Sequence, residues 1–128
     1  MIYVDTSVIL AHVLAEDQSP DDALWNETLV SSRLTHYETW TRLHARRLGT
    51  SHGSLAREAL GRLAIVELSQ VVLERALDAF PVPVRALDAL HLATLAFLVG
   101  QKQRPTLATY DARMADAAAR LGFDLHPL

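Results

Sequence analysis

Four acidic residues stand where the sequence passes from a strand or loop into a helix: Asp5, Glu38, Asp88 and Asp111. A fold that brings these junctions together would gather four carboxylates with no lysine nearby in the sequence. Clustered negative charges raise one another's pKa unless hard cations neutralise them, and carboxylate oxygens are the ligands that Mg²⁺ and Mn²⁺ prefer. The chemistry that follows is metal-assisted displacement at phosphorus, in which one ion activates water and one or both stabilise the leaving oxygen.

Asp5 and Asp111 each have an ordinary structural alternative. Both precede helical segments, as N-cap residues do. Thr6 and Ser7 are good caps too, so we expect one of them to cap the first helix and to free the Asp5 carboxylate. Both acids also follow predicted strands, which places them at the carboxyl edge of a parallel sheet, where ligands gather.

Glu38 and Asp88 also allow two interpretations. Glu38 completes the Thr-x-x-Glu pattern that begins at Thr35, which is typical of a capping box. Asp88 belongs to a helix that is apolar nearly all round, where His91 and Thr94 are its only polar companions. A buried carboxylate must be paired, bind a metal or line a cleft, although an acid in a first helical turn, hydrogen-bonded to His91, is the ordinary alternative.

The elements that position these acids alternate between short apolar strands and helices. We expect strands at 1–4, 28–32, 64–68 and 106–109, with an edge strand at 123–125, and helices at 6–15, 20–26, 35–48, 54–63, 70–79, 86–99 and 111–121. Gly49, Gly100 and Gly122 are expected to end helices. This alternation predicts a single α/β domain over residues 1–128, a three-layer α/β/α sandwich with a mainly parallel, short-stranded sheet.

Composition narrows the class of protein. The 128 residues include no cysteine, which excludes disulfides, thiolate metal sites and a cysteine nucleophile. The longest apolar stretch, 86–99, is too short to span a bilayer, and an N-terminal strand leaves no room for a signal peptide, so we expect a soluble cytoplasmic protein. A net charge of −3 excludes an overall basic footprint. The excess of arginine, eleven against one lysine, fits either phosphate contacts or the base composition of the source genome.

The four acids lie in segments that resemble those of PIN-domain ribonucleases, specifically the VapC-type toxins of toxin–antitoxin pairs. The matching segments are Ile-Tyr-Val-Asp-Thr-Ser at 2–7, Thr-His-Tyr-Glu at 35–38, Leu-Asp-Ala-Leu-His-Leu-Ala-Thr at 87–94 and Leu-Ala-Thr-Tyr-Asp at 107–111. Their order and spacing fit over nearly the whole chain. The resemblance implies that Asp5, Glu38, Asp88 and Asp111 form an acidic quartet, although family members vary at the position of Asp111.

The resemblance also implies an activity and partners. It implies Mg²⁺- or Mn²⁺-dependent endonucleolytic cleavage of RNA, often tRNA or rRNA, with one or two ions bound and a 3′-hydroxyl left. Thr6 and Thr109 would be nearby hydroxyls that position a ligand or water. The implied partners are a VapB-type antitoxin that blocks the site and a second copy in a homodimer. We interpret His91 as a packing or supporting residue, because metal-assisted hydrolysis needs no imidazole.

Fewer residues give evidence for RNA binding or for the rival functions. Arg42 and Arg46 are spaced i, i+4 on the helix that carries Glu38, which fits phosphate contacts or an ordinary solvated face. A non-catalytic, protein-binding α/β module, with every acid a cap, is the rival from another class, and a metal-dependent nuclease outside a toxin–antitoxin pair is a third possibility. A haloacid-dehalogenase-like phosphatase is disfavoured because Ser7 stands where a second Asp would be needed. Dinucleotide binding lacks a Gly-rich turn.

Overall fold

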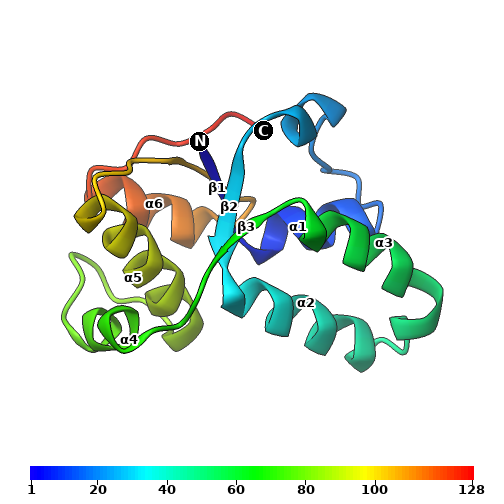
Figure 1. Ribbon diagram of the computed structural model, residues 1–128, viewed down its shortest axis with the longest axis horizontal. Helices are drawn as coiled ribbons and strands as arrows, with labels where there is room; N and C mark the ends of the chain where they lie inside the picture. Colours follow the sequence, from blue (N-terminus) through cyan, green and yellow to red (C-terminus); the bar gives the residue numbers. More distant parts are fainter.

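The computed structural model describes residues 1–128, and its centre is a parallel sheet between two groups of helices (Figure 1). The strands are β1 Ile2–Val4, β2 Leu29–Ser32, β3 Ala64–Val66 and β4 Thr106–Ala108. They are ordered β3-β2-β1-β4, and every pair is parallel. All four lie within their predicted ranges, so the predicted parallel sheet is confirmed.

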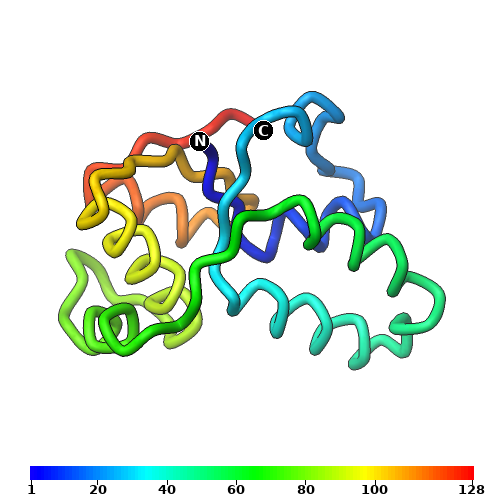
Figure 2. Tube along the Cα trace, viewed as in Figure 1, coloured from blue at the N-terminus to red at the C-terminus, as the bar shows by residue number.

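The helices cover both faces of the sheet. They are α1 Thr6–Val13, α2 Arg33–Ala45, α3 Gly49–Gly61, α4 Gln70–Leu77, α5 Ala86–Gly100 and α6 Ala112–Arg120. In Figures 1 and 2, the first three helices lie on one side of the sheet and the last three on the other. This is the predicted three-layer α/β/α sandwich.

The protein has two hydrophobic cores, one on each face of the sheet. Strand β1 contributes side chains to both, because they alternate between the faces of the sheet. Ile2 and Val4 pack in the cluster that α1, α2 and α3 complete, whereas Tyr3 packs with residues of α5 and α6. The chain places β2 on one side of β1 and β4 on the other, so the strand order reverses beside β1. In open α/β sheets, ligands bind beyond the carboxyl ends of the strands at such a reversal.

Several predicted helix limits were wrong. Residues 20–26 form no α-helix, and the structure has a 3₁₀ helix, η1, at Asp22–Asn26. Helix α2 begins two residues early, since Ser32 caps it by accepting the backbone N–H of Leu34 at 3.0 Å. Gly49 does not end α2; it begins α3, and the left-handed residue between the two helices is Arg47, with φ 57°.

The C-terminal part departs from the prediction in the same way. Gly100 belongs to α5, and Lys102, with φ 61°, takes the left-handed conformation after it. Gly122, with φ 87°, follows α6 as predicted. The edge strand expected at 123–125 is reduced to a single bridge between Leu107 and Leu125. None of the helices combines the length and apolar character needed to cross a bilayer.

Candidate active site

A cavity of about 570 Å³ lies at the carboxyl ends of β1 and β4, and all four predicted acids line it. They reach it from the ends of two strands and from two helices, so residues 106 positions apart in sequence share one wall. Thr6 and Arg42 also line the cavity, whereas Arg46, at the C-terminal end of α2, does not. Further lining residues are Ser7, Arg85, His91 and Tyr110.

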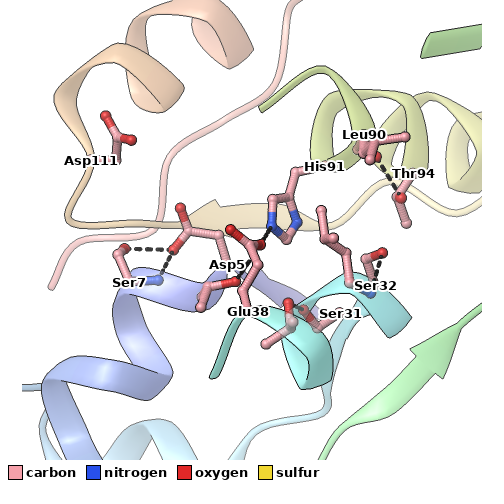
Figure 3. A network of polar contacts seen from close by, with 12 residues as sticks. Asp5, Ser7, Ser31, Ser32, Glu38, Leu90, His91, Thr94 and Asp111 are labelled. Atoms are coloured by element: carbon pink, nitrogen blue, oxygen red, sulfur yellow. Dashed lines mark hydrogen bonds and ion pairs between the residues drawn. The ribbon is translucent and has the colours of Figure 1, made fainter. Parts of the chain in front are cut away.

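Asp5 is buried and serves as the N-cap of α1 (Figure 3). Its Oδ1 accepts the backbone N–H of Ser7 at 3.1 Å and the Ser7 hydroxyl, and its Oδ2 accepts the Thr109 hydroxyl. The expectation that Thr6 or Ser7 would replace Asp5 as the cap was therefore wrong. The extended backbone of Asp5, with φ −88° and ψ 178°, holds its carboxylate over the first turn of the helix.

The charge of Asp5 is poorly compensated within the protein. Burial raises the pKa of this carboxyl above its ordinary value, and the charge of Asp111 adds to the rise. The hydrogen bonds from Ser7 and Thr109 and the nearby His91 oppose the rise in pKa without cancelling it. No lysine or arginine pairs with Asp5. A buried carboxylate in this condition gains from a bound cation.

Glu38 forms no capping box. Its Oε1 accepts the Thr6 hydroxyl at 2.7 Å and lies 2.7 Å from Nε2 of His91, while Thr35 pairs with Ser31 instead. The capping alternative is therefore excluded, and Oε2 of Glu38 has no hydrogen bond within the protein. Burial alone would raise the pKa of Glu38, but the hydrogen bonds from His91 and Thr6, with the charge of Arg42, outweigh it and lower the pKa.

His91 is buried between Tyr3 and Glu38. Figure 3 shows its ring beside the carboxylate of Glu38. The hydroxyl of Tyr3 lies 2.7 Å from Nδ1, and when it donates its proton there, Nε2–H is left to donate to Glu38. The alternative contact between His91 and Asp88 does not form. His91 therefore supports Glu38, and Tyr3 of the central strand supports His91 in turn.

Asp88 and Asp111 are joined by one side chain that the sequence interpretation missed. Nε of Arg85 lies 3.3 Å from Oδ2 of Asp88, and its terminal nitrogen lies 3.5 Å from Oδ2 of Asp111. Asp111 also caps α6 through Oδ1, which accepts the backbone N–H groups of Arg113 and Met114. The i, i+3 spacing of Arg85 and Asp88 was the available signal for this contact.

Ser7 and Tyr3 are the other supporting residues that the sequence interpretation missed. Besides donating to Asp5, Ser7 accepts the backbone N–H of Tyr110 at 2.9 Å, which ties the start of α1 to the segment after β4. Thr109 does not line the cavity; its hydroxyl donates a hydrogen bond to Oδ2 of Asp5. Tyr3 gave no signal, because an aromatic residue in an apolar strand is ordinarily a core residue.

The donor chemistry of the cavity fits a hard divalent cation. The four predicted acids, the carboxylate of Glu16 and the hydroxyls of Thr6 and Ser7 offer oxygen ligands, with no thiolate. Asp5, Glu38, Asp88 and Asp111 are the residues that would hold the ion. In the arrangement of this structure, no three acidic or histidine side chains are grouped closely enough to hold a metal ion, and Arg85 lies between Asp88 and Asp111.

Comparison with known proteins assigns the chain to a family. The PIN domain family matches residues 2–120. Ribonuclease VapC46 of Mycobacterium tuberculosis (strain ATCC 25618 / H37Rv) is 37% identical over 126 residues, covering 94% of this chain and 92% of the relative. Ribonuclease VapC47 of the same species (strain CDC 1551 / Oshkosh) is 29% identical over 130 residues, covering 96% and 93%.

A solved structure shares the fold along the whole chain. It is the crystal structure of Mycobacterium tuberculosis VapC20, described as a sarcin-ricin loop cleaving toxin. The TM-score is 0.69 at 20% sequence identity, with 99% of this chain and 100% of that chain covered. The family match, the relatives and the fold agree with one another. The chain belongs to the PIN-domain family, among the ribonucleases of the VapC type.

Proposed function

We propose that this protein is a Mg²⁺- or Mn²⁺-dependent endoribonuclease that acts as a toxin and is neutralised by a cognate antitoxin. The observation that carries the proposal is the gathering of Asp5, Glu38, Asp88 and Asp111 on one cavity. The ribonuclease names of the relatives support RNA as the substrate class. A bound divalent ion would supply an activated water and stabilise the leaving oxygen of a phosphodiester.

The protein's own contribution is to fix the acids before substrate arrives. Asp5 is held by Ser7 and Thr109, and Glu38 is held by Thr6 and His91 through Oε1 alone. Oε2 of Glu38 is therefore available to the cavity. Side chains locked by such contacts need no reorganisation when the reaction begins, which is the usual requirement of a catalytic site.

Substrate binding falls to basic residues around the acids. Arg42 lines the cavity one helical turn after Glu38 and is placed to contact a phosphate. Arg46 lies outside the cavity, so any phosphate contact it makes is farther along the RNA. We propose tRNA or rRNA as the substrate, because these are the classes of RNA that the family resemblance implies.

Cleavage of RNA by the purified protein tests the enzymatic proposal. A pool of cellular RNAs should be cleaved with Mg²⁺ or Mn²⁺ and spared with EDTA. Asp5→Asn and Asp88→Asn should abolish cleavage, whereas Asp116→Asn, which removes an exposed acid paired with Arg120 on α6, should not. No cleavage and no toxicity on induction would contradict the proposal.

Coexpression tests the proposed partners. A VapB-type antitoxin expressed with this protein should copurify with it and silence the cleavage, and light scattering of the purified protein should report a homodimer. A neighbouring reading frame that encodes no small DNA-binding protein would instead favour a nuclease outside a toxin–antitoxin pair.

A non-catalytic protein-binding module has two observations in its favour: Asp5 and Asp111 do cap helices, and Arg85 pairs with Asp88 and Asp111. Titration with Mg²⁺ separates the two functions. A catalytic metal site should raise the melting temperature as the ion is added, and a set of caps should not respond.

A further inference from the structure

A second hollow adjoins the acid-lined cavity and shares two residues with it, Arg85 and Asp88. Its volume is about 240 Å³, and it lies between the start of α5 and the face of α6. The lining residues are Pro83, Val84, Arg85, Asp88, Arg113 and Ala117. Arg85 therefore stands at the boundary between the two spaces.

The sign of the charge changes at this boundary. The acid-lined cavity carries five carboxylates against two guanidinium groups, whereas the second hollow carries the guanidinium groups of Arg85 and Arg113 against the single carboxylate of Asp88. Three of the lining residues, Pro83, Val84 and Ala117, are apolar. Low-polarity walls strengthen the attraction between a guanidinium and an anion.

Neither arginine is committed to a strong contact within the protein. The side chain of Arg113 forms no ion pair and no hydrogen bond within the protein; only its backbone N–H contacts Asp111. Arg85 pairs with Asp88 and Asp111 at 3.3 and 3.5 Å, and its side chain is 65% exposed. Both contacts are long and the guanidinium is open to solvent, although Asp88 and Asp111 are mostly buried, so the Arg85 guanidinium can turn toward an incoming anion.

We propose that Arg85 and Arg113 form a subsite for the phosphate that neighbours the scissile one in a single-stranded RNA. The inference depends on the proposed ribonuclease function. An RNA strand is a chain of closely spaced phosphates, so a strand with one phosphate at the acids places its neighbour in the adjoining hollow. The planar guanidinium fork matches phosphate oxygens in pairs.

Arg113 is the clean probe of this subsite, because Arg85 also contacts two of the acids. We would measure binding of a short fluorescent single-stranded RNA by anisotropy at several salt concentrations, in an Asp5→Asn background that prevents cleavage. Arg113→Gln should weaken binding about tenfold and reduce the slope of log affinity against log salt by about 0.7, which is the loss of one phosphate contact to a single strand.

Two further variants sharpen the test. Arg113→Lys keeps the charge and should keep the salt slope while losing part of the affinity, because lysine cannot bind in the forked geometry. Arg120→Gln, which removes an exposed arginine of the same helix that pairs with Asp116, should change neither quantity. The side chain of Arg113 is exposed and unpaired, so the Arg113 variants should retain the wild-type circular dichroism and melting temperature.

Failure of the subsite is distinguishable from failure of the proposed function. The subsite is wrong if Arg113→Gln binds RNA with unchanged affinity and slope, or if it loses only binding to a coexpressed antitoxin. Cleavage by the protein with Asp5 and Arg113 intact reports on the ribonuclease function separately. Absence of RNA binding in every variant would overturn the subsite, and absence of cleavage by the intact protein would overturn the ribonuclease function.

Discussion

At the scale of the residue, the choice between a helix cap and a metal ligand is not exclusive, because a carboxylate has two oxygens. Asp111 caps α6 with Oδ1 and turns Oδ2 toward Arg85 at the cavity. Glu38 uses only Oε1 for its contacts with Thr6 and His91. Each of these acids is fixed through one oxygen and keeps the other for the cavity. A carboxylate that caps a helix at the edge of the sheet can therefore also take part in the chemistry of the cavity.

Asp5→Asn should lower the cleavage activity and raise the stability of the folded protein at pH 7. We expect cleavage to fall by more than about 100-fold, since even the partners of metal ligands are worth 10–100-fold. Asn is an equally good N-cap, so α1 keeps its first turn. Above the raised pKa of Asp5, the buried charge lowers the stability of the wild type, and the variant should be the more stable protein at pH 7.

The pH dependence of that difference has a defined sign. The folded-state pKa of Asp5 lies above its ordinary value of 3.8, so its stabilising contribution is complete below 3.8 and is lost as the pH rises through the folded-state pKa. Urea unfolding of both proteins at pH 3.5 and pH 7 checks this. The advantage of the Asn variant should shrink in acid, and a wild type that is the more stable at pH 7 would contradict the prediction.

Tyr3→Phe should test whether His91 acts through a defined tautomer. The variant keeps the buried ring and removes the hydroxyl that contacts Nδ1. We expect a loss of about tenfold in kcat with little change in KM, and a cost of about 1–3 kcal/mol in stability. The ¹⁵N chemical shifts of His91 should report a changed tautomer population.

Tyr37→Phe is the matched control for that variant, because Tyr37 is 64% exposed. It should alter neither kcat nor the ¹⁵N shifts. If Tyr3→Phe lowers stability but leaves kcat and the His91 shifts unchanged, the hydroxyl contributes only to packing.

At the scale of the element, the strands were easier to predict than the helix ends. Short apolar runs bounded by polar residues define β1 and β4 without tertiary information. Helix ends were misplaced where Gly49 and Gly100 were expected to take left-handed conformations, which Arg47 and Lys102 take instead. Packing of neighbouring helices decides which residue bears that strain, and the sequence of one helix does not contain this information.

Three glycine substitutions should separate helical from left-handed positions. Gly61 and Gly100 have no atom within 4 Å of an added Cβ and no positive φ, so Gly61→Ala and Gly100→Ala should each stabilise by about 0.5–1 kcal/mol. Gly122→Ala should destabilise by about 1–2 kcal/mol, because Gly122 has φ 87° and its Cβ would meet the Arg104 guanidinium at 3.3 Å. Urea denaturation measures all three, and a destabilising Gly100→Ala would contradict the assignment.

At the scale of the whole molecule, topology explains why the acids could be predicted to meet. A parallel sheet puts the ends of β1 and β4 at one edge, which brings Asp5 and Asp111 together. The N-terminal halves of α2 and α5 carry Glu38 and Asp88 to the same cavity. The contacts of Tyr3 and Arg85 could not be predicted in the same way. They depend on which face of a strand or helix turns toward another layer, and spacing along the sequence leaves that undetermined.

Because of the position of the acids, a metal ion bound in the cavity would be coupled to the stability of the whole domain. Asp5 and Glu38 belong to the ends of β1 and the α2 layer, whereas Asp88 and Asp111 belong to the layer of α5 and α6, so one ion in the cavity would connect both layers. An ion at 100 times its dissociation constant stabilises the native state by about 2.7 kcal/mol. Because that free energy corresponds to a rise of several degrees for a domain of this size, calorimetry should detect it.

The melting temperature of the wild type should therefore rise with Mg²⁺ concentration, and the Asp5→Asn and Asp88→Asn variants should lose most of the response. Arg85→Gln should increase the response, because its guanidinium occupies Asp88 and Asp111 in the absence of the ion and competes with it. Asp116→Asn, outside the cavity, should respond like the wild type. A response that is equal in all of these proteins would place the ion elsewhere and remove the structural basis for a metal-dependent reaction at this cavity.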